Sequence, residues 1–375
     1  MKHFIHDTIL EKDDICNLTK ETNEINSGIK LKKKMVIYGQ RNSGKTSLIK
    51  NSIIKKFQND NKLSFVLFCD LMEVKDLNSI NLRVKSSFEK AFIKTFPKEA
   101  WIKQIGKFLS GLRPSLSVDS ITGETTFSLS SEKLEKELTF SDIFSIIQKK
   151  ISKEIPTLIV LDEFQDIALI KEAQGLFRDS LQKMNNISVI VMGSKKHLLS
   201  KMFAVPDAPF ADFGFDIEFQ NIPYKEYFEY SLERLKPRKI KLNFETSKYW
   251  QNLMQRNPEA MNILGAYLVE NFTNQEITNE KINITIQLIT EQRRSRFEEL
   301  LRFLKNSEED ILIAICKFGP IKEPSSKDFT SKVKFTHATV LKAFQSLENH
   351  SFIEKTIDGY NVCNPLLKYY LLKNR

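Results

Sequence analysis

Short apolar runs of strand length recur through the first part of the chain. Four of them, at 35–38, 63–68, 157–161 and 187–192, are apolar at nearly every position. Such runs are typical of strands buried on both faces, as in a parallel sheet covered by helices. Residues 216–219 are a candidate for a fifth strand. We therefore expect an α/β core built on a parallel sheet.

Helical spacing fills the segments between these runs. Three phenylalanines lie four residues apart within 84–109, and residues 140–153 also have helical periodicity. Between these two segments, apolar residues alternate around Thr122-Gly123, at Leu116, Val118, Phe127 and Leu129. This alternation predicts an inserted β-hairpin. Near the N-terminus, a short helix is expected around residues 13–21.

The last 70 residues have the pattern of a small separate unit. Residues 310–318 and 325–333 look helical, and Thr336 is a good N-cap for a third helix. One face of that helix would carry Val340, Leu341, Phe344 and Leu347. Ile357-Asp358-Gly359 then marks a hairpin turn between two short strands. Three helices followed by a hairpin predict a winged helix-turn-helix.

These patterns predict four parts along the chain. Residues 1–34 would form an N-terminal helical extension, 35–220 a core with the parallel sheet, 221–305 a helical lid, and 306–375 the winged helix. The length of 375 residues agrees with two or three domains.

Composition and charge narrow the class of protein. Hydrophobic residues make up 41% and charged residues 28%, a globular balance. No apolar run approaches the roughly 18–20 residues of a spanning helix, and the N-terminus turns acidic before a signal peptide could form. We therefore expect a cytoplasmic protein with no membrane association. The net charge of +10 favours polyanionic partners, and the four widely spaced cysteines give no zinc motif.

The strongest chemical signal is the stretch from Gly39 to Thr46, which matches G-x-x-x-x-G-K-[ST] in full. An apolar strand precedes it and an apolar helix follows. Such a loop wraps phosphates with backbone N–H groups, while Lys45 would reach the β- and γ-phosphates and the Thr46 hydroxyl would hold Mg²⁺. The candidate nucleotide-binding residues are Gly39, Gln40, Arg41, Asn42, Ser43, Gly44, Lys45, Thr46 and Ser47.

A second signal is the acidic pair that ends the run at 157–161. Asp162 at a strand tip can hold Mg²⁺, and Glu163 can polarise the attacking water. The run at 187–192 is followed by Gly193-Ser194, so Ser194 would lie near the γ-phosphate as a sensor. A further strand lies between Lys45 and Asp162 in the sequence. This spacing with a catalytic glutamate indicates the ATPase branch of P-loop proteins, and the missing N-K-x-D tetrad favours ATP over GTP.

Taken together, the segments GQRNSGKTSL, LIVLDEFQD, VMGSKKHLLSKM and APFADFGF resemble the archaeal-type AAA ATPase family, close to STAND and replication-initiator-like ATPases. The resemblance spans residues 10–375. It implies a five-stranded parallel sheet, a helical lid and a winged-helix domain. It also implies Pro258 as a neighbour of the adenine, since Arg256-Asn257-Pro258 stands where STAND ATPases have Gly-x-Pro.

The sequence departs from this family in its arginines. The family usually has an arginine soon after the stretch that corresponds to 209–215, and this chain lacks one there. Arg256 would act either as a cationic sensor or as a helix cap. Arg178 would be either a finger supplied in trans to another subunit of an oligomer or part of a solvated helix face. The missing arginine favours slow turnover.

The sequence therefore predicts a P-loop ATPase that depends on ATP and Mg²⁺ and moves a winged-helix domain. It would act either as a nucleotide-gated switch or as a slow hydrolase. The alternatives are a non-catalytic ATP-gated DNA-binding regulator and a replication-initiator-like DNA-binding ATPase. The winged helix would dock DNA or a protein. Its near balance of ten Lys and Arg against eight Asp and Glu offers few phosphate contacts. Basic clusters at 234–241 and 293–296 offer more.

Overall fold

The computed structural model describes residues 2–97, 104, 107–108, 112–118, 125–131, 138–356 and 358–375. The chain divides into two compact units. One, which we call the sheet unit, comprises Leu18–Gln40 and Gly44–Gln220. The other, which we call the helical unit, comprises Met1–Asn17, Arg41–Ser43 and Asn221–Arg375. The expected N-terminal extension, 1–34, thus contributes to both units.

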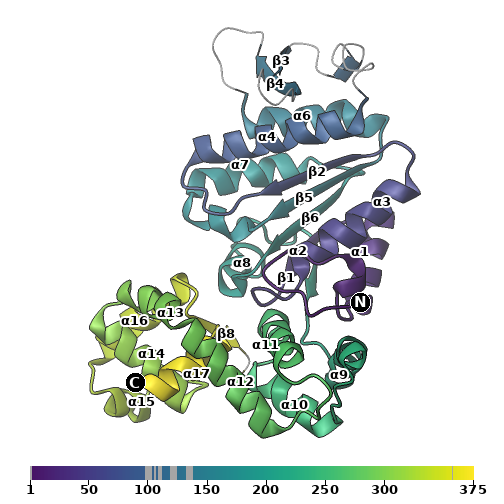
Figure 1. The fold of residues 1–375 in the computed structure, drawn as a ribbon. Helices are drawn as coiled ribbons and strands as arrows, with labels where there is room; N and C mark the ends of the chain where they lie inside the picture. The colour runs from purple at the N-terminus through teal and green to yellow at the C-terminus, as the bar shows by residue number, and fades with distance from the viewer. Residues whose placement is uncertain are drawn as a thin grey trace. The chain divides into compact units, whose positions relative to one another are not determined.

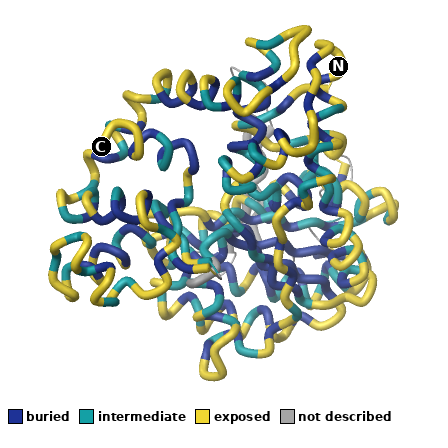
Figure 2. The backbone as a smooth tube through the Cα atoms, turned by 90° about the horizontal axis from the view of Figure 1, so that it is seen from below, coloured by how far each residue is buried: buried dark blue, intermediate teal, exposed yellow. Residues whose placement is uncertain are grey.

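Five strands form the sheet in the order β2-β5-β6-β1-β7 (Figure 1). They are β1 (Lys34–Tyr38), β2 (Phe65–Asp70), β5 (Thr157–Asp162), β6 (Ser188–Gly193) and β7 (Phe215–Glu218). All neighbouring strands run parallel. Every residue of β5 and β6 is buried, and buried stretches of the chain are dark blue in Figure 2. The parallel sheet expected from the apolar runs is therefore confirmed, and β6 is the strand that separates β1 from β5.

Helices cover both faces of this sheet (Figure 1). Those of the sheet unit are α1 (Thr19–Lys30), α2 (Lys45–Leu48), α3 (Lys55–Asp60), α4 (Leu77–Thr95), α6 (Phe140–Lys149), α7 (Lys171–Gln182) and α8 (Lys196–Phe203). A π-helical segment, Ile49–Ile54, joins α2 to α3. Capping boxes begin two of the helices, with Asp76 at α4 and Thr139 at α6. Phenylalanines fill much of the core, as in the stacked pair of Phe140 and Phe177.

The inserted hairpin is present as the antiparallel strands β3 (Leu112–Val118) and β4 (Thr125–Ser131). Its expected turn at Thr122-Gly123 lies outside the described residues. The helix expected around 13–21 is wrong. A single 3-10 turn, Lys12–Asp14, is followed by non-helical chain, and α1 begins only at Thr19. Asn17 has a positive φ of 22°, which an α-helix cannot accommodate.

The helical unit contains the remaining elements. They are α9 (Tyr224–Leu235), α10 (Phe244–Leu253), α11 (Pro258–Asn271), α12 (Asn279–Gln292), α13 (Arg294–Arg302), α14 (Asn306–Phe318), α15 (Lys327–Val333), α16 (His337–Asn349), β8 (Ile353–Thr356), β9 (Gly359–Val362) and α17 (Pro365–Asn374). Helices α14 to α16 and the β8–β9 hairpin form the expected winged helix. Among the helices in the described ranges, none is long and apolar enough to cross a membrane.

The third helix of the winged helix, α16, follows the expected pattern with one exception. Thr336 caps it by accepting a hydrogen bond from the Thr339 N–H. Val340, Phe344 and Leu347 are buried as expected, but Leu341 is 43% exposed. Leu341 therefore lies outside the buried face, because one step of 100° from Val340 turns it toward solvent. Ile357 of the hairpin turn lies outside the described residues.

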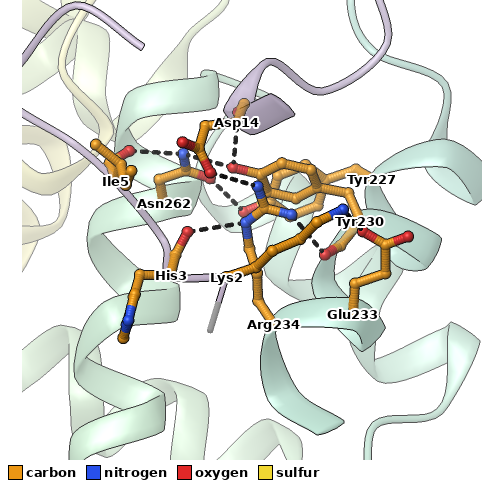
Figure 3. A network of polar contacts seen from close by, with 9 residues as sticks. All are labelled: Lys2, His3, Ile5, Asp14, Tyr227, Tyr230, Glu233, Arg234 and Asn262. Carbon is orange, nitrogen blue, oxygen red and sulfur yellow. Dashed lines mark hydrogen bonds and ion pairs between the residues drawn. The ribbon is translucent and has the colours of Figure 1, made fainter. Parts of the chain in front are cut away.

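Residues 2–17, the N-terminal strap, pack into the helical unit. The Phe4 ring lies against Tyr230 and Trp250, with centroids 6.1 and 5.7 Å away. The buried Arg234 holds the strap at two points (Figure 3): it donates to the His3 carbonyl at 2.9 Å and pairs with the Asp14 carboxylate at 3.1 Å. Arg234 therefore belongs to the interior and not to the cationic surface expected from the 234–241 cluster.

Replacing Asp14 by alanine should lower the free energy of unfolding by about 2 kcal/mol, because the buried Arg234 guanidinium loses its carboxylate partner. Chemical denaturation with a fluorescence readout would measure this loss. The nearby pair of Lys2 and Glu233 is a control, since both side chains are about half exposed. Glu233→Gln should cost less than about 1 kcal/mol. Equal losses for the two variants would contradict the role given to the buried pair.

Candidate nucleotide site

The carboxyl ends of the parallel strands bring the predicted residues of the sheet unit to one edge. Gly39 follows β1, Asp162 ends β5, and Ser194 follows β6. The register pairs Asp70 at the end of β2 with Asp162. Parallel strands end at the same edge of a sheet, which is where ligands bind in open α/β folds. The structure therefore gathers residues that lie up to 155 positions apart, as 39 and 194 do.

The phosphate loop runs from the end of β1 into α2. Gly44 has a φ of +89°, a left-handed conformation that glycine adopts without strain, and Asn42 also has a positive φ of 61°. Lys45 is only 6% exposed. Its Nζ donates to the carbonyl oxygens of Gly39 at 2.9 Å and Gln40 at 2.7 Å. The ammonium group is thereby held within the curve of its own loop.

A second contact joins the loop helix to β5. The Thr46 hydroxyl donates to Asp162 Oδ2 at 2.9 Å, and the Glu163 N–H donates to Asp162 Oδ1 at 2.9 Å. Burial raises the pKa of Asp162 to about 6, with further increases from the charges of Glu163 and Asp70 and a decrease from the Thr46 hydrogen bond. Hydroxyl and carboxylate oxygens are the ligands that Mg²⁺ prefers, and a cation there would offset the cost of the buried charge. The pair therefore fits a magnesium site.

The Glu163 carboxylate is held beside the end of β6. The Ser194 hydroxyl donates to Glu163 Oε2 at 3.1 Å, and the Gln165 amide donates to the same oxygen. Glu163 itself has a φ of +50°, a conformation that costs a non-glycine residue free energy and is enriched at functional sites. Sequence reasoning gave no role to Gln165. Its only signal was its place in the stretch Asp162-Glu163-Phe164-Gln165.

Other predicted residues belong to the helical unit. Pro258 is the first residue of α11, and its neighbour Asn257 caps that helix by accepting from the Ala260 N–H at 3.0 Å. Within this unit Asn257 also donates to the Arg41 carbonyl at 3.3 Å, and the Asn42 amide hydrogen-bonds the carboxylate of Glu259. The contact of Pro258 with adenine stays a prediction.

The two arginines with open roles differ in their surroundings. The Arg256 guanidinium lies 4.4 Å from the centre of the Tyr224 ring and donates to the Ile222 carbonyl at 2.5 Å. These contacts favour a structural role for Arg256 at the start of the 221–375 segment. Arg178 is exposed on α7, which agrees with a solvated face and equally with a finger supplied in trans.

Comparisons with known proteins give two matching families and several similar folds. Residues 17–203 match the family described as "ATPase domain predominantly from Archaea", and residues 295–373 match the family described as "Probable winged helix domain". No curated protein matches the sequence. The solved structure of a Walker-type ATPase of Pyrococcus abyssi is similar, with a TM-score of 0.64 and 15% identity, over 98% of this chain and 99% of that one.

Two structures from Aeropyrum pernix are also similar. The ORC2 protein, solved as ADPNP–ADP complexes, has a TM-score of 0.54 and 11% identity, over 99% of this chain and 95% of that one. The ORC1 protein, solved in complex with DNA, has a TM-score of 0.50 and 11% identity, over 100% and 98%. At such identities the likeness shows the fold alone. The chain therefore carries an ATPase domain of the family that occurs predominantly in Archaea, followed by a winged helix domain.

Proposed function

We propose that the chain binds ATP with Mg²⁺ and hydrolyses it slowly at the carboxyl edge of its sheet. The observation that carries this proposal is the connected set of contacts there, from Thr46 through Asp162 to Glu163 and Ser194. Lys45 would neutralise charge on the β- and γ-phosphates. Thr46 and Asp162 would hold Mg²⁺, which supplies charge neutralisation between the phosphates.

In this proposal Glu163 orients the attacking water and accepts its proton. Ser194, hydrogen-bonded to Glu163, would lie beside the γ-phosphate and sense it. Turnover is slow because no arginine lies soon after the 209–215 stretch to stabilise the charge of the transition state.

The nucleotide state would also act as a switch on the helical unit. This part of the proposal is supported by the path of the chain: three residues of the phosphate loop, Arg41–Ser43, belong to the helical unit, while the loop residues on either side belong to the sheet unit. Small-angle scattering of Glu163→Gln with ATP, compared with ADP, should give different radii of gyration. The same comparison in Lys45→Ala should show no difference, and identical curves in Glu163→Gln would contradict the switch.

Binding to DNA is a second candidate function, favoured by the winged helix and by the solved complex of the ORC1 protein with DNA. On α16, Lys342 and Gln345 are exposed, whereas Thr339 and Ser346 are half-buried. Exposed cations also lie in the helical unit outside the winged helix, among them Lys236, Arg238, Lys239, Lys241, Arg294 and Arg296. Arg293 is less available, since its side chain is 22% exposed and lies 3.9 Å from Asp7.

Any DNA binding should therefore be weak and not sequence-selective. Each phosphate contact contributes about −0.9 to the slope of log K against log salt. Changing Arg294 and Arg296 together to glutamine should flatten this slope by up to about two, and changing Lys342 alone by about one at most. Fluorescence anisotropy at several salt concentrations would measure it, with a scrambled duplex as control. Selectivity that disappears in Thr339→Ala would instead show a base-reading helix and favour the DNA-binding regulator.

A further inference from the structure

Gln165 lies in the 3-10 helical segment Phe164–Leu169, which directly follows Glu163. Its side chain is 2% exposed. Its amide nitrogen donates to Glu163 Oε2 and, at 3.2 Å, to Asp166 Oδ1. A carboxylate only accepts hydrogen bonds, so the group that faces these two oxygens must be the NH₂ end of the amide. Gln165 therefore bridges two carboxylates with its two amide protons.

The other end of the amide has no such partner. Within the described residues, Gln165 Oε1 is buried without a hydrogen bond. A buried oxygen that lost its water and gained no donor lowers stability. An apolar side chain of the same length would avoid that cost but would lose both hydrogen bonds to the carboxylates, so what glutamine adds at this position is its contact with these two groups.

The surroundings fix where this side chain lies. A Cβ atom on Gly193, at the end of β6, would stand 1.9 Å from Gln165 Oε1. The absence of a side chain at Gly193 thus leaves the space that the amide occupies. Asp166, the second carboxylate, is itself anchored, because its Oδ2 accepts from the Glu73 N–H at 2.7 Å. The amide is therefore held from both sides, by the end of β6 and by Asp166.

The Gln165 amide affects the orientation of the Glu163 carboxylate. Both hydrogen bonds to its carboxylate, from Gln165 and from Ser194, end on Oε2. Within the described part of the chain, Oε1 receives none and is left for a water. We propose that Gln165 is a positioning residue, which orients the Glu163 carboxylate so that Oε1 meets the water that attacks ATP. This inference rests on the proposed hydrolysis and adds a residue to its machinery.

Gln165→Met tests it, because methionine keeps the length of the side chain and removes both amide protons. We expect kcat for ATP hydrolysis to fall about 10- to 100-fold, with KM for ATP and the affinity for a non-hydrolysable analogue within about twofold of the wild type. The melting temperature should change little, because the variant removes one unpaired buried oxygen together with two hydrogen bonds. Unchanged kcat, or a loss of nucleotide affinity as large as the loss of kcat, would overturn the inference.

A double-mutant cycle shows whether Gln165 acts through Glu163. In the Glu163→Gln background, Gln165→Met should lower the rate by less than about twofold, because the group that it positions is already gone. A full further loss there would overturn the inference. Gln174→Ala is the matched control: its amide donates to the Ala168 carbonyl of the same 3-10 segment at 2.6 Å and does not contact Glu163. This variant should keep the wild-type rate.

Gly193→Ala tests the position of the Gln165 amide independently, from the end of β6. The added methyl group should push the Gln165 amide away and lower kcat in the wild type, yet cost little further in a Gln165→Ala background. Equal losses of kcat in both backgrounds would overturn the inference.

These variants also distinguish failure of the proposed function from failure of the inference. If the wild type releases no phosphate, the proposed function and the inference both fail. If Glu163→Gln is slow and Gln165→Met runs at the wild-type rate, the inference fails alone.

Discussion

Glu163→Gln should bind ATP with Mg²⁺ at close to the wild-type affinity and hydrolyse it about 100- to 10,000-fold more slowly. The amide keeps the shape of the side chain and its hydrogen bond to Ser194, but it cannot accept the proton of the attacking water. Single-turnover hydrolysis of labelled ATP, together with calorimetric binding, separates these two effects.

Glu172→Gln is the control for this substitution, since Glu172 is an exposed carboxylate in the first turn of α7. It should hydrolyse ATP at the wild-type rate. If Glu163→Gln also turned over at that rate, Glu163 would not be the base, and the role given to the end of β5 would be wrong.

Lys45→Ala should weaken ATP binding at least about 100-fold. The ammonium group is buried in the phosphate loop, where bulk water does not compete for its hydrogen bonds. Each charge-assisted hydrogen bond to phosphate is about twice as strong as a neutral one. The same group donates to the Gly39 and Gln40 carbonyls, so it is already placed in the loop. Isothermal titration calorimetry with ATP and Mg²⁺ measures the loss.

Lys56→Ala is the matched control, because Lys56 lies on α3 further along the same helical stretch and pairs with Asp60 in solvent. Its ATP affinity should match that of the wild type. An unchanged affinity in Lys45→Ala would remove the phosphate loop from the nucleotide site.

The strands and the winged helix could be predicted because their signals are local. A strand buried on both faces, such as β5, shows as a continuous apolar run, and a helix cap such as Thr336 is recognised within four residues. The N-terminal strap gave no comparable signal. Its contacts join Phe4 and Asp14 to α9, more than 200 positions away, and no local pattern distinguishes a buried Arg234 from its exposed cationic neighbours.

The candidate site divides in the same way. The phosphate loop and the acidic pair at the end of β5 are contiguous motifs whose chemistry requires particular residue types, so they stand out in the sequence. Gln165 does not, because its role depends on the end of β6 lying beside it. The sequence also does not show which end of the Gln165 amide faces Glu163. That orientation follows from the carboxylates of Glu163 and Asp166, which accept hydrogen bonds only from the NH₂ end of the amide.

The most direct test of the account is the steady-state release of phosphate from ATP by the purified wild-type chain, with Lys45→Ala measured in parallel as the blank. We expect a slow, saturable release of phosphate that requires Mg²⁺ and is absent from the blank. A wild-type rate no greater than that of Lys45→Ala, at saturating ATP and Mg²⁺, would contradict hydrolysis at the carboxyl edge of the sheet and leave the non-catalytic regulator as the better account.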